Sequence, residues 1–241
     1  MATARNSDAY FIRGRPYVRV TRVLSVLARP GLVEWAAAQV AERAVGGLTT
    51  LQRLATQDPD RAAAWLAAAP TALRDEAAER GRAVHEAVRA VLLGAPTPWL
   101  GPAEAGCLSA FLKFWERERF QTILAAEGLV ISETYGYAGT LDLLATDNAS
   151  ITLIDLKTTG DFRPEHDLQV TAYAFADIYH DLTGQPRPMP AVDRLLIVRL
   201  NPNGTYATRE IFPDPETLEV FLACLRIYRW LTRTHAEVPD A

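Results

Sequence analysis

The sequence predicts an α/β or α+β fold, in which a mainly helical first half precedes a mixed sheet flanked by helices. Three observations support this. Apolar residues recur at helical spacing in Ala-, Arg- and Glu-rich segments from about residue 20 to 118. From about residue 119, segments rich in Val, Ile, Thr and Tyr favour strands. No repeat or clear linker separates the halves, so we expect one domain over residues 1–241, with the first helices packed as a cap or arch.

The helical half begins after a short predicted hairpin with Gly14 in its turn. Thr21 is a plausible N-cap for the helix that follows the hairpin. Further breaks are expected at Pro59 and Pro70, and Pro102 is placed to start the last helix. The expected elements are a hairpin at 10–21 and helices at 20–28, 32–45, within 48–89 and at 102–120.

The second half is expected to form the sheet. Residues 128–160 favour three antiparallel strands, with Asp147 and Asn148 forming the turn before the third strand. Alternating apolar runs and turn residues then extend the pattern to the end of the chain. The expected elements are a helix at 164–182, a strand at 193–200, a turn at 201–204, a strand at 205–212 and a helix at 215–233.

Composition excludes several classes of protein. The formal net charge is −4, so a nucleic-acid partner would need a local basic patch. Cys107 and Cys224 are the only cysteines, which excludes a Cys₄ zinc site, a four-cysteine iron–sulfur cluster and a disulfide framework. No apolar run reaches the length of a membrane span, and the N-terminus lacks the apolar core of a secretory signal, so we expect a cytoplasmic protein. No P-loop motif is present.

Lysine is rare in this chain. Of 25 basic residues only Lys113 and Lys157 are lysine, and a genome that favours Arg codons explains the bias. An ammonium is a compact charge whose pKa can move, whereas a guanidinium is a planar fork that stays protonated. A lysine kept against this background therefore indicates a specific requirement.

Charged residues end the apolar strand predicted at 151–157 (ITLIDLK). Side chains alternate faces along a strand, so Asp155 and Lys157 project together. Asp142 lies on the preceding strand, and counting back from the turn brings it near Asp155. Two carboxylates about 4 Å apart repel by roughly 4 kcal/mol at an effective dielectric of about 20, and a divalent cation reverses that repulsion. Mg²⁺ and Mn²⁺ prefer such ligands; the alternative is a solvated Asp–Lys pair at a strand end.

Asp142, followed by Asp155-Leu156-Lys157, resembles the core of the PD-(D/E)xK nuclease superfamily. His85 in RGRAVHEAV is similar to the helix histidine of the RecB-type exonuclease branch. Gln169 and Tyr173 in QVTAY resemble the Q-x-x-x-Y motif of that branch.

Two further segments extend the resemblance to most of the chain. Glu133 in SETYGYAGTLD matches an acidic position of the same branch. Residues 20–36 look like the N-terminal helix pair of the mitochondrial genome maintenance exonuclease and related phage-type exonucleases. Some relatives carry four cysteines for an iron–sulfur cluster, which this chain cannot form.

The resemblance implies a restriction-endonuclease-like fold and a Mg²⁺ or Mn²⁺ site. The implied metal ligands are His85, Asp142, Asp155 and the carbonyl of Leu156. The implied catalytic residues are Asp142, Asp155, Lys157, Glu133, Gln169 and Tyr173. Taken singly, three of these residues have simpler explanations. His85 could be a surface histidine, Tyr173 could serve core packing, and Glu133 could be a solvated strand residue.

Contacts with nucleic acid are assigned to Arg82, Arg89 and Thr158. The arginines either touch phosphates or form a solvated helix face balanced by neighbouring glutamates. Together these inferences predict a metal-dependent deoxyribonuclease, most simply an exonuclease acting on single-stranded DNA ends in repair, recombination or replication. Any unwinding then needs a separate helicase or single-strand-binding protein. A structure-specific or double-strand endonuclease, a catalytically silent nucleic-acid-binding module and a metal-binding structural protein are the alternatives.

Overall fold

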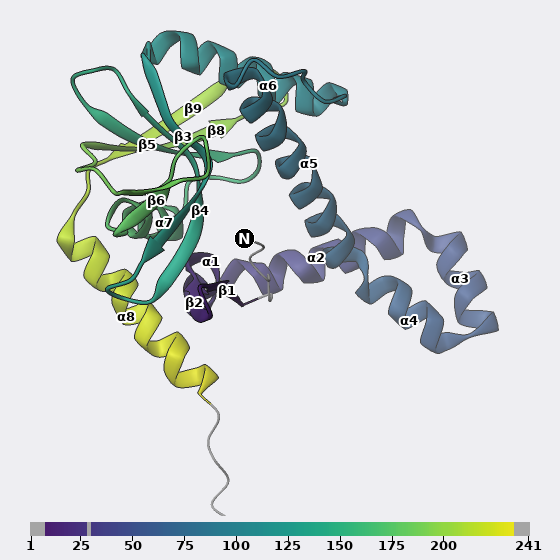
Figure 1. The fold of residues 1–241 in the computed structure, drawn as a ribbon. Coiled ribbons are helices and arrows are strands. Elements are labelled where there is room, and N and C mark those ends of the chain that lie inside the picture. The colour runs from purple at the N-terminus through teal and green to yellow at the C-terminus, as the bar shows by residue number, and fades with distance from the viewer. Residues whose placement is uncertain (1–7, 28–29, 234–241) are drawn as a thin grey trace, which may run out of the picture. The chain divides into compact units, whose positions relative to one another are not determined.

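The computed structural model describes residues 8–27 and 30–233. The chain divides into two compact units, and Figure 1 shows the elements of each. Residues 28–83 form one unit, and the segments before and after them form the other. The N-terminal hairpin and the helix at 102–118 thus belong with the sheet. The expectation of a single nuclease domain with a helical cap or arch stays a prediction.

The helical unit is formed by consecutive helices, three of which begin at or next to a proline. It contains α2 (Pro30–Gly46), α3 (Leu48–Gln57), α4 (Pro59–Ala67) and the start of α5 (Ala69–Leu92). Pro59 occupies the first turn of α4, where its missing N–H costs nothing, and Asp58 caps that helix by accepting from the Arg61 amide at 3.1 Å. The expected breaks at Pro59 and Pro70 are therefore confirmed. Nowhere in residues 8–27 and 30–233 is a helix both long and apolar enough to span a membrane.

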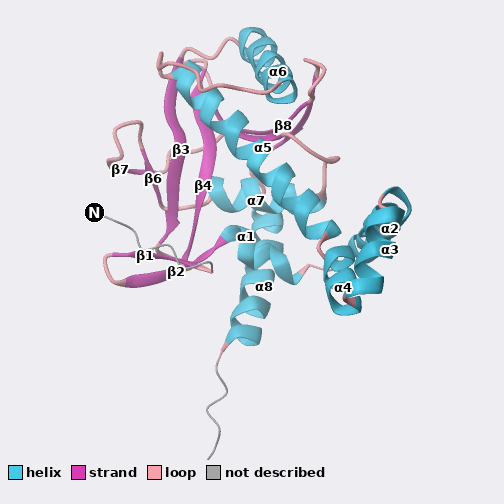
Figure 2. Cartoon of the chain, turned by 90° about the vertical axis from the view of Figure 1, so that its right-hand side faces the viewer, coloured by secondary structure: helices cyan, strands magenta, loops and turns pink. Residues whose placement is uncertain are grey.

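Within the described residues the strands form one nine-stranded, mostly antiparallel sheet (Figure 2). Its main order is β7-β6-β3-β4-β5-β8-β9, and the β1–β2 hairpin joins it through β4. The strands are β1 (Ala9–Ile12), β2 (Arg15–Arg19), β3 (Thr122–Ser132), β4 (Tyr137–Thr146), β5 (Ile151–Lys157), β6 (Ile178–His180), β7 (Pro186–Pro188), β8 (Arg194–Leu200) and β9 (Tyr206–Ile211). The predicted mixed sheet flanked by helices is confirmed.

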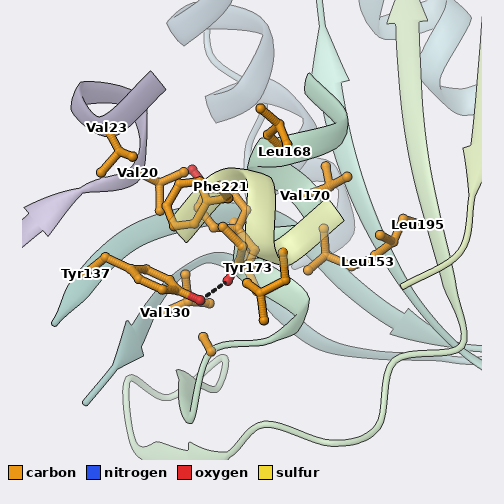
Figure 3. Packing of buried hydrophobic residues seen from close by; sticks show 14 of the residues in the cluster. Val20, Val23, Val130, Tyr137, Leu153, Leu168, Val170, Tyr173, Leu195 and Phe221 are labelled. Carbon is orange, nitrogen blue, oxygen red and sulfur yellow. Dashed lines mark hydrogen bonds between the residues drawn. The ribbon is translucent and has the colours of Figure 1, made fainter. Parts of the chain in front are cut away.

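Helices cover both faces of the sheet. On one face, α1 (Val20–Val23), η1 (Leu24–Val26), α7 (Pro164–Ala174) and α8 (Pro215–Thr232) pack on one apolar cluster. Figure 3 shows this cluster, in which the buried Tyr137 hydroxyl donates to the Ala172 carbonyl at 2.8 Å. On the other face, the second half of α5 and α6 (Pro102–Glu118) pack on a second cluster. Leu153 faces the first cluster and Ile154 the second, as strand alternation predicts.

Strand β4 changes its partner along its length. Its second half pairs with β5, from Leu143 opposite Ile154 to Thr146 opposite Ile151. Its first two residues pair instead with β2. Among the described residues, none of β5 pairs with residues 139–142. The sheet therefore has an opening beside β4, between the end of β2 and the point where β5 diverges.

Two local predictions were wrong. The helix expected at 164–182 ends at Ala174, and residues 178–180 form β6 on the edge of β3. Asp177 explains the change, because its carboxylate accepts from the Thr134 amide and hydroxyl and fixes the segment to the β3–β4 turn. Thr21 is not an N-cap, because α1 already begins at Val20.

Candidate active site

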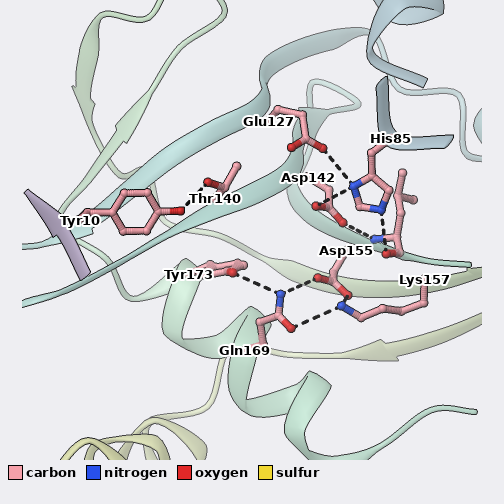
Figure 4. A network of polar contacts seen from close by, with 10 residues as sticks. Tyr10, His85, Glu127, Thr140, Asp142, Asp155, Lys157, Gln169 and Tyr173 are labelled. Carbon is pink, nitrogen blue, oxygen red and sulfur yellow. Dashed lines mark hydrogen bonds and ion pairs between the residues drawn. The ribbon is translucent and has the colours of Figure 1, made fainter. Parts of the chain in front are cut away.

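The opening in the sheet is filled by a carboxylate. Asp142 would lie opposite Asp155 if the β4–β5 ladder continued past Leu143. Instead, the Leu156 amide donates to Asp142 Oδ2 at 2.6 Å, so a side chain replaces the missing backbone partner (Figure 4). The alternation of β4 is also interrupted there, since Leu141 faces one core cluster and Leu143 the other. The divergence of the strands thus places one carboxylate between them.

His85 approaches Asp142 from α5. Its Nδ1 lies 3.4 Å from Asp142 Oδ1 and 3.1 Å from Glu127 Oε1. Its Nε2 lies 3.3 Å from the Leu156 carbonyl oxygen. Glu127 reaches this position from β3 with a φ of 53°, an uncommon backbone conformation for a residue other than glycine. Both ring nitrogens thus face oxygen acceptors.

Asp155 and Lys157 form a second group, on the α7 side of the sheet. Lys157 Nζ lies 2.7 Å from Asp155 Oδ2 and 3.4 Å from Gln169 Oε1. Gln169 Nε2 donates to Asp155 Oδ1 at 3.0 Å and to the Tyr173 hydroxyl at 3.2 Å. The Tyr173 ring packs so closely on Gly139 that a Cβ there would lie 2.4 Å from the ring. The four side chains therefore hold one another in a single arrangement.

The two groups perturb each other's pKa values. Burial lowers the pKa of His85, but the adjacent Asp142 and Glu127 outweigh it and raise this pKa well above its ordinary value. Burial acts to raise the pKa of Asp142, yet His85, Lys157 and the Leu156 amide together hold it below its ordinary value. Both shifts favour a protonated His85 beside an ionised Asp142 in the metal-free site.

Burial prevails over charged neighbours at Asp155, whereas at Lys157 the charged neighbours prevail over burial. Burial raises the pKa of Asp155 to about 6, against the opposing attraction of Lys157. Burial acts to lower the pKa of Lys157, but Asp155 and Asp142 outweigh it and raise this pKa above its ordinary value. Like-charged carboxylates in a buried site are a common feature of centres that hold a cation or move a proton.

The donor atoms fit a divalent cation. The ligand atoms of His85, Glu127 and Asp142 all lie within 4.8 Å of one another. One imidazole and two carboxylates suit Mn²⁺, and the carboxylates also suit Mg²⁺. The Leu156 carbonyl faces Nε2 of His85, whereas the two carboxylates face Nδ1, so its assignment as a ligand stays a prediction. Asp155 is not part of this group, because its oxygens face Lys157 and Gln169.

Comparison with protein families shows which superfamily the chain belongs to. The model of the PD-(D/E)XK nuclease superfamily matches residues 39–220. The chain belongs to this superfamily. Its D-x-K element is Asp155-Leu156-Lys157, preceded by Asp142 on the neighbouring strand. The superfamily predicted from these residues is confirmed, and its members use divalent metals.

Comparisons with curated sequences and with solved structures add little to the family assignment. A comparison with curated protein sequences gave no match. The solved structure of SSO0001 is similar at 16% identity and a TM-score of 0.35, over 66% of this chain and 73% of the other. An alkaline exonuclease, LHK-Exo from Laribacter hongkongensis, is similar at 17% identity and a TM-score of 0.33, over 64% of this chain and 84% of the other. The family model alone carries the assignment.

The structure brings together most of the predicted nuclease residues but not all of them. His85, Asp142, Asp155, Lys157, Gln169 and Tyr173 form the two groups described above. Glu133 is an exposed residue in the β3–β4 turn, so the structure does not support its catalytic assignment. It lies six residues beyond Glu127, or roughly 20 Å of extended chain.

The predicted DNA contacts lie outside these groups. Arg89 is exposed on α5, four residues after His85 and thus on the same helix face. Thr158 is half-buried directly after β5. Arg82 is exposed, and it belongs to the helical unit. Their contact with nucleic acid stays a prediction.

Sequence interpretation missed three residues at or beside the candidate site: Glu127, Thr140 and Tyr10. Glu127 is a lone glutamate in an apolar strand, and its approach depends on a backbone conformation that no motif encodes. Thr140 lies at the opening in the sheet, two residues before Asp142, and its hydroxyl lies 3.0 Å from that of Tyr10 on β1 (Figure 4). The only available signal was the Thr in the quoted AGTLD segment.

Proposed function

We propose that this protein is a metal-dependent DNA exonuclease that hydrolyses phosphodiester bonds from single-stranded ends. The observation that carries the proposal is the meeting of His85 and Asp142 with Asp155 and Lys157 where β4 and β5 separate. It combines a cation-binding group with a buried ammonium within one opening of the sheet. The same chemistry serves DNA repair, recombination or replication.

Each group of side chains has its own task in this reaction. His85, Glu127 and Asp142 would hold a Mg²⁺ or Mn²⁺ ion, which would supply an activated water and neutralise charge on the scissile phosphate. His85 must lose its proton to act as a ligand, since only neutral imidazole binds a metal. Gln169 fixes Asp155 and Lys157 relative to each other. The Lys157 ammonium then stabilises negative charge that develops on the phosphate oxygens.

The end-directed and single-strand parts of the proposal rest on the resemblance of residues 20–36 to the N-terminal helix pair of phage-type exonucleases. The helical unit is the part of the chain that would select a strand end. Because the sequence contains no P-loop, a separate helicase or single-strand-binding protein would supply single strands from a duplex. We keep a cytoplasmic location as part of the proposal.

The decisive experiment compares four DNA substrates: linear and circular, each single- and double-stranded. The linear DNA is labelled at either end, and every reaction is run with Mg²⁺, Mn²⁺ or EDTA. The proposal expects metal-dependent release of short products from linear single strands and intact circles. The labelled end that disappears first gives the polarity.

Other outcomes would overturn specific parts of the proposal. Cleavage of circles would identify an endonuclease on the same core. Binding without cleavage under every metal condition would identify a silent nucleic-acid-binding module. Cleavage that persists in EDTA would remove the metal mechanism. Preferential degradation of RNA oligonucleotides of the same sequence would replace the DNA assignment.

A further inference from the structure

Arg199 lies on β8, next to the strand that carries Asp155 and Lys157. Strand β8 runs parallel to β5, and Arg199 is the register partner of Lys157. Leu195 and Ile197 on β8 face the α7 side, so strand alternation places Arg199 on the same side as Lys157. Neighbouring strands are about 4.8 Å apart. Two cationic side chains therefore leave the ends of adjacent strands toward the same face.

The environment of Arg199 leaves part of its guanidinium without a protein partner. One terminal nitrogen, Nη1, donates to Asp161 Oδ1 at 2.6 Å. The guanidinium carbon lies 5.7 Å from the centre of the Phe162 ring. Nε is buried and has no hydrogen-bond partner among the described residues. A buried N–H without an acceptor is costly, and such a group in a native structure indicates a missing partner.

Asp161 is a counterion that is easily displaced. It lies in the segment after β5, and its side chain is 92% exposed. Exposed ion pairs contribute little to stability, because water screens both charges. The guanidinium side chain itself is 30% exposed. A phosphate with two free oxygens matches the planar fork of an arginine better than one mobile carboxylate does.

We propose that Arg199 binds a backbone phosphate of the substrate strand adjacent to the one attacked beside Lys157, and that Asp161 occupies this phosphate position in the free protein. The inference rests on the proposed nuclease function. Binding exchanges the exposed Asp161 carboxylate on Nη1 for a phosphate that has more oxygens to offer the guanidinium. The contact involves no base, so it positions the strand without reading its sequence.

A purely structural role for the Arg199–Asp161 pair predicts a different pattern. If the pair only anchors the segment after β5, loss of either partner damages the protein in the same way. If Arg199 binds phosphate, loss of the arginine weakens DNA binding, whereas loss of Asp161 removes a competitor. The two variants then change affinity in opposite directions. This difference separates the two explanations without any measurement of activity.

The test measures binding of a short fluorescein-labelled single-stranded oligonucleotide by anisotropy in EDTA, over a series of salt concentrations. The variants are Arg199→Gln, Arg199→Lys and Asp161→Asn. Arg187→Gln is the matched control, because Arg187 also forms an exposed pair with an aspartate but lies on β7, at the far end of the sheet order. Thermal unfolding of every variant shows whether it remains folded.

Arg199→Gln is expected to bind about tenfold more weakly. Its slope of log affinity against log salt should fall by about 0.7, which corresponds to one lost phosphate contact on a single strand. Arg199→Lys keeps the charge and restores the slope, with only part of the affinity. Asp161→Asn should bind about twofold more tightly than the parent protein. Arg187→Gln should not differ from the parent protein.

Kinetics give a second readout. With Mn²⁺ present, Arg199→Gln should raise KM more than it lowers kcat, because the contact is made equally in the ground and transition states. Equal losses of affinity in Arg199→Gln and Asp161→Asn, or an Arg199→Gln affinity equal to that of Arg187→Gln, would overturn the inference while leaving the nuclease function intact. A parent protein that neither binds nor cleaves DNA would overturn both.

Discussion

The two halves of β4 form a pair of contrasting environments within one strand. From Leu143 to Thr146 the strand pairs with β5 and contributes apolar side chains to both core clusters. From Gly139 to Asp142 it has no β5 partner and is lined by hydroxyls, a carboxylate and a tyrosine ring. Toward β5, the backbone ladder is present in one half and is replaced by side chains in the other, whereas β3 pairs with both halves.

This contrast suggests a division of roles: the paired half of β4 contributes to stability, and the open half contributes to the candidate site. The paired half buries side chains such as Leu144, which is fully buried. The open half lacks a backbone ladder toward β5, although residues 139–141 still pair with β3, and the Asp142–Leu156 contact joins it to β5. Substitutions in the open half should therefore affect activity, and those in the paired half should affect folding.

The largest effect is expected at the carboxylates. Asp142→Asn and Asp155→Asn should each lower metal-dependent cleavage by about a thousandfold or more, because each removes a charge that holds the cation or orients Lys157. The amide oxygen introduced by Asp142→Asn can still accept from the Leu156 amide, so this variant should remain folded. End-labelled DNA assays with circular dichroism of the same samples check both points. Retained cleavage in either variant would contradict the proposal that these carboxylates serve activity.

Lysine identity at position 157 should matter almost as much. Lys157→Arg is expected to be nearly as inactive as Lys157→Ala, since a planar fork cannot replace a compact ammonium between Asp155 and Gln169. Turnover of both variants under saturating Mn²⁺ measures this. Near-parental turnover in Lys157→Arg would mean that the position supplies only positive charge.

The paired half of β4 should respond in the opposite way. Leu144→Ala removes a fully buried side chain and should lower the free energy of unfolding by about 2–5 kcal/mol. Its cleavage rate per folded molecule, measured at low temperature, should remain close to that of the parent protein. Urea denaturation gives the stability and the DNA assay gives the rate. A large loss of rate in the folded fraction would show that the two halves are coupled.

Metal affinity tests the contact between α5 and the open half. His85→Ala should weaken Mn²⁺ binding about tenfold or more in calorimetric titration, because it removes one of three ligand atoms that lie together. Activity should favour Mn²⁺ over Mg²⁺, since an imidazole ligand suits the softer ion. Equal affinities in the two proteins would return His85 to the role of a surface histidine.

The same titration has a pH signature. The pKa of His85 is raised well above its ordinary value by its acidic neighbours once burial is offset, so the metal-free protein keeps the proton into higher pH. Protons compete with the metal, and affinity should therefore fall as pH falls through that raised pKa. Binding should release protons, which titrations in buffers of different ionisation enthalpy detect. In His85→Ala the pH dependence over this window should be much weaker.

Periodicity and turn residues were sufficient to predict most of the fold. The hairpin, the three antiparallel strands and the last helix all follow from local patterns that the structure reproduces. The failure at residues 175–182 has a tertiary cause. Asp177 binds the β3–β4 turn, and β6 pairs with β3, so long-range contacts override a local helical pattern.

Within the site, the rare lysines illustrate the same limit. Rarity singles out Lys157, whose role stays a prediction. It singles out Lys113 as well, yet Lys113 donates to the Gly204 carbonyl at 2.8 Å and so fixes the turn after β8 to α6. The sequence cannot distinguish these uses. Nor can it show that β4 and β5 separate at Asp142, because the separation depends on pairing with β2 and β8.

The smallest effect is expected at Glu133, and it compares the sequence interpretation with the structure directly. Glu133→Gln alters an exposed turn residue and should change cleavage and Mn²⁺ affinity by less than about twofold. Glu127→Gln changes the same chemical group six residues earlier, but at a position 3.1 Å from His85, and should weaken Mn²⁺ binding clearly. It should also lower the pKa of His85, because one of the carboxylates that raise this pKa is lost. Paired titrations of the two variants, with NMR of the His85 ring, decide the matter. A larger loss in Glu133→Gln than in Glu127→Gln would restore the motif-based assignment and show that the strand conformation at Glu127 has no part in metal binding.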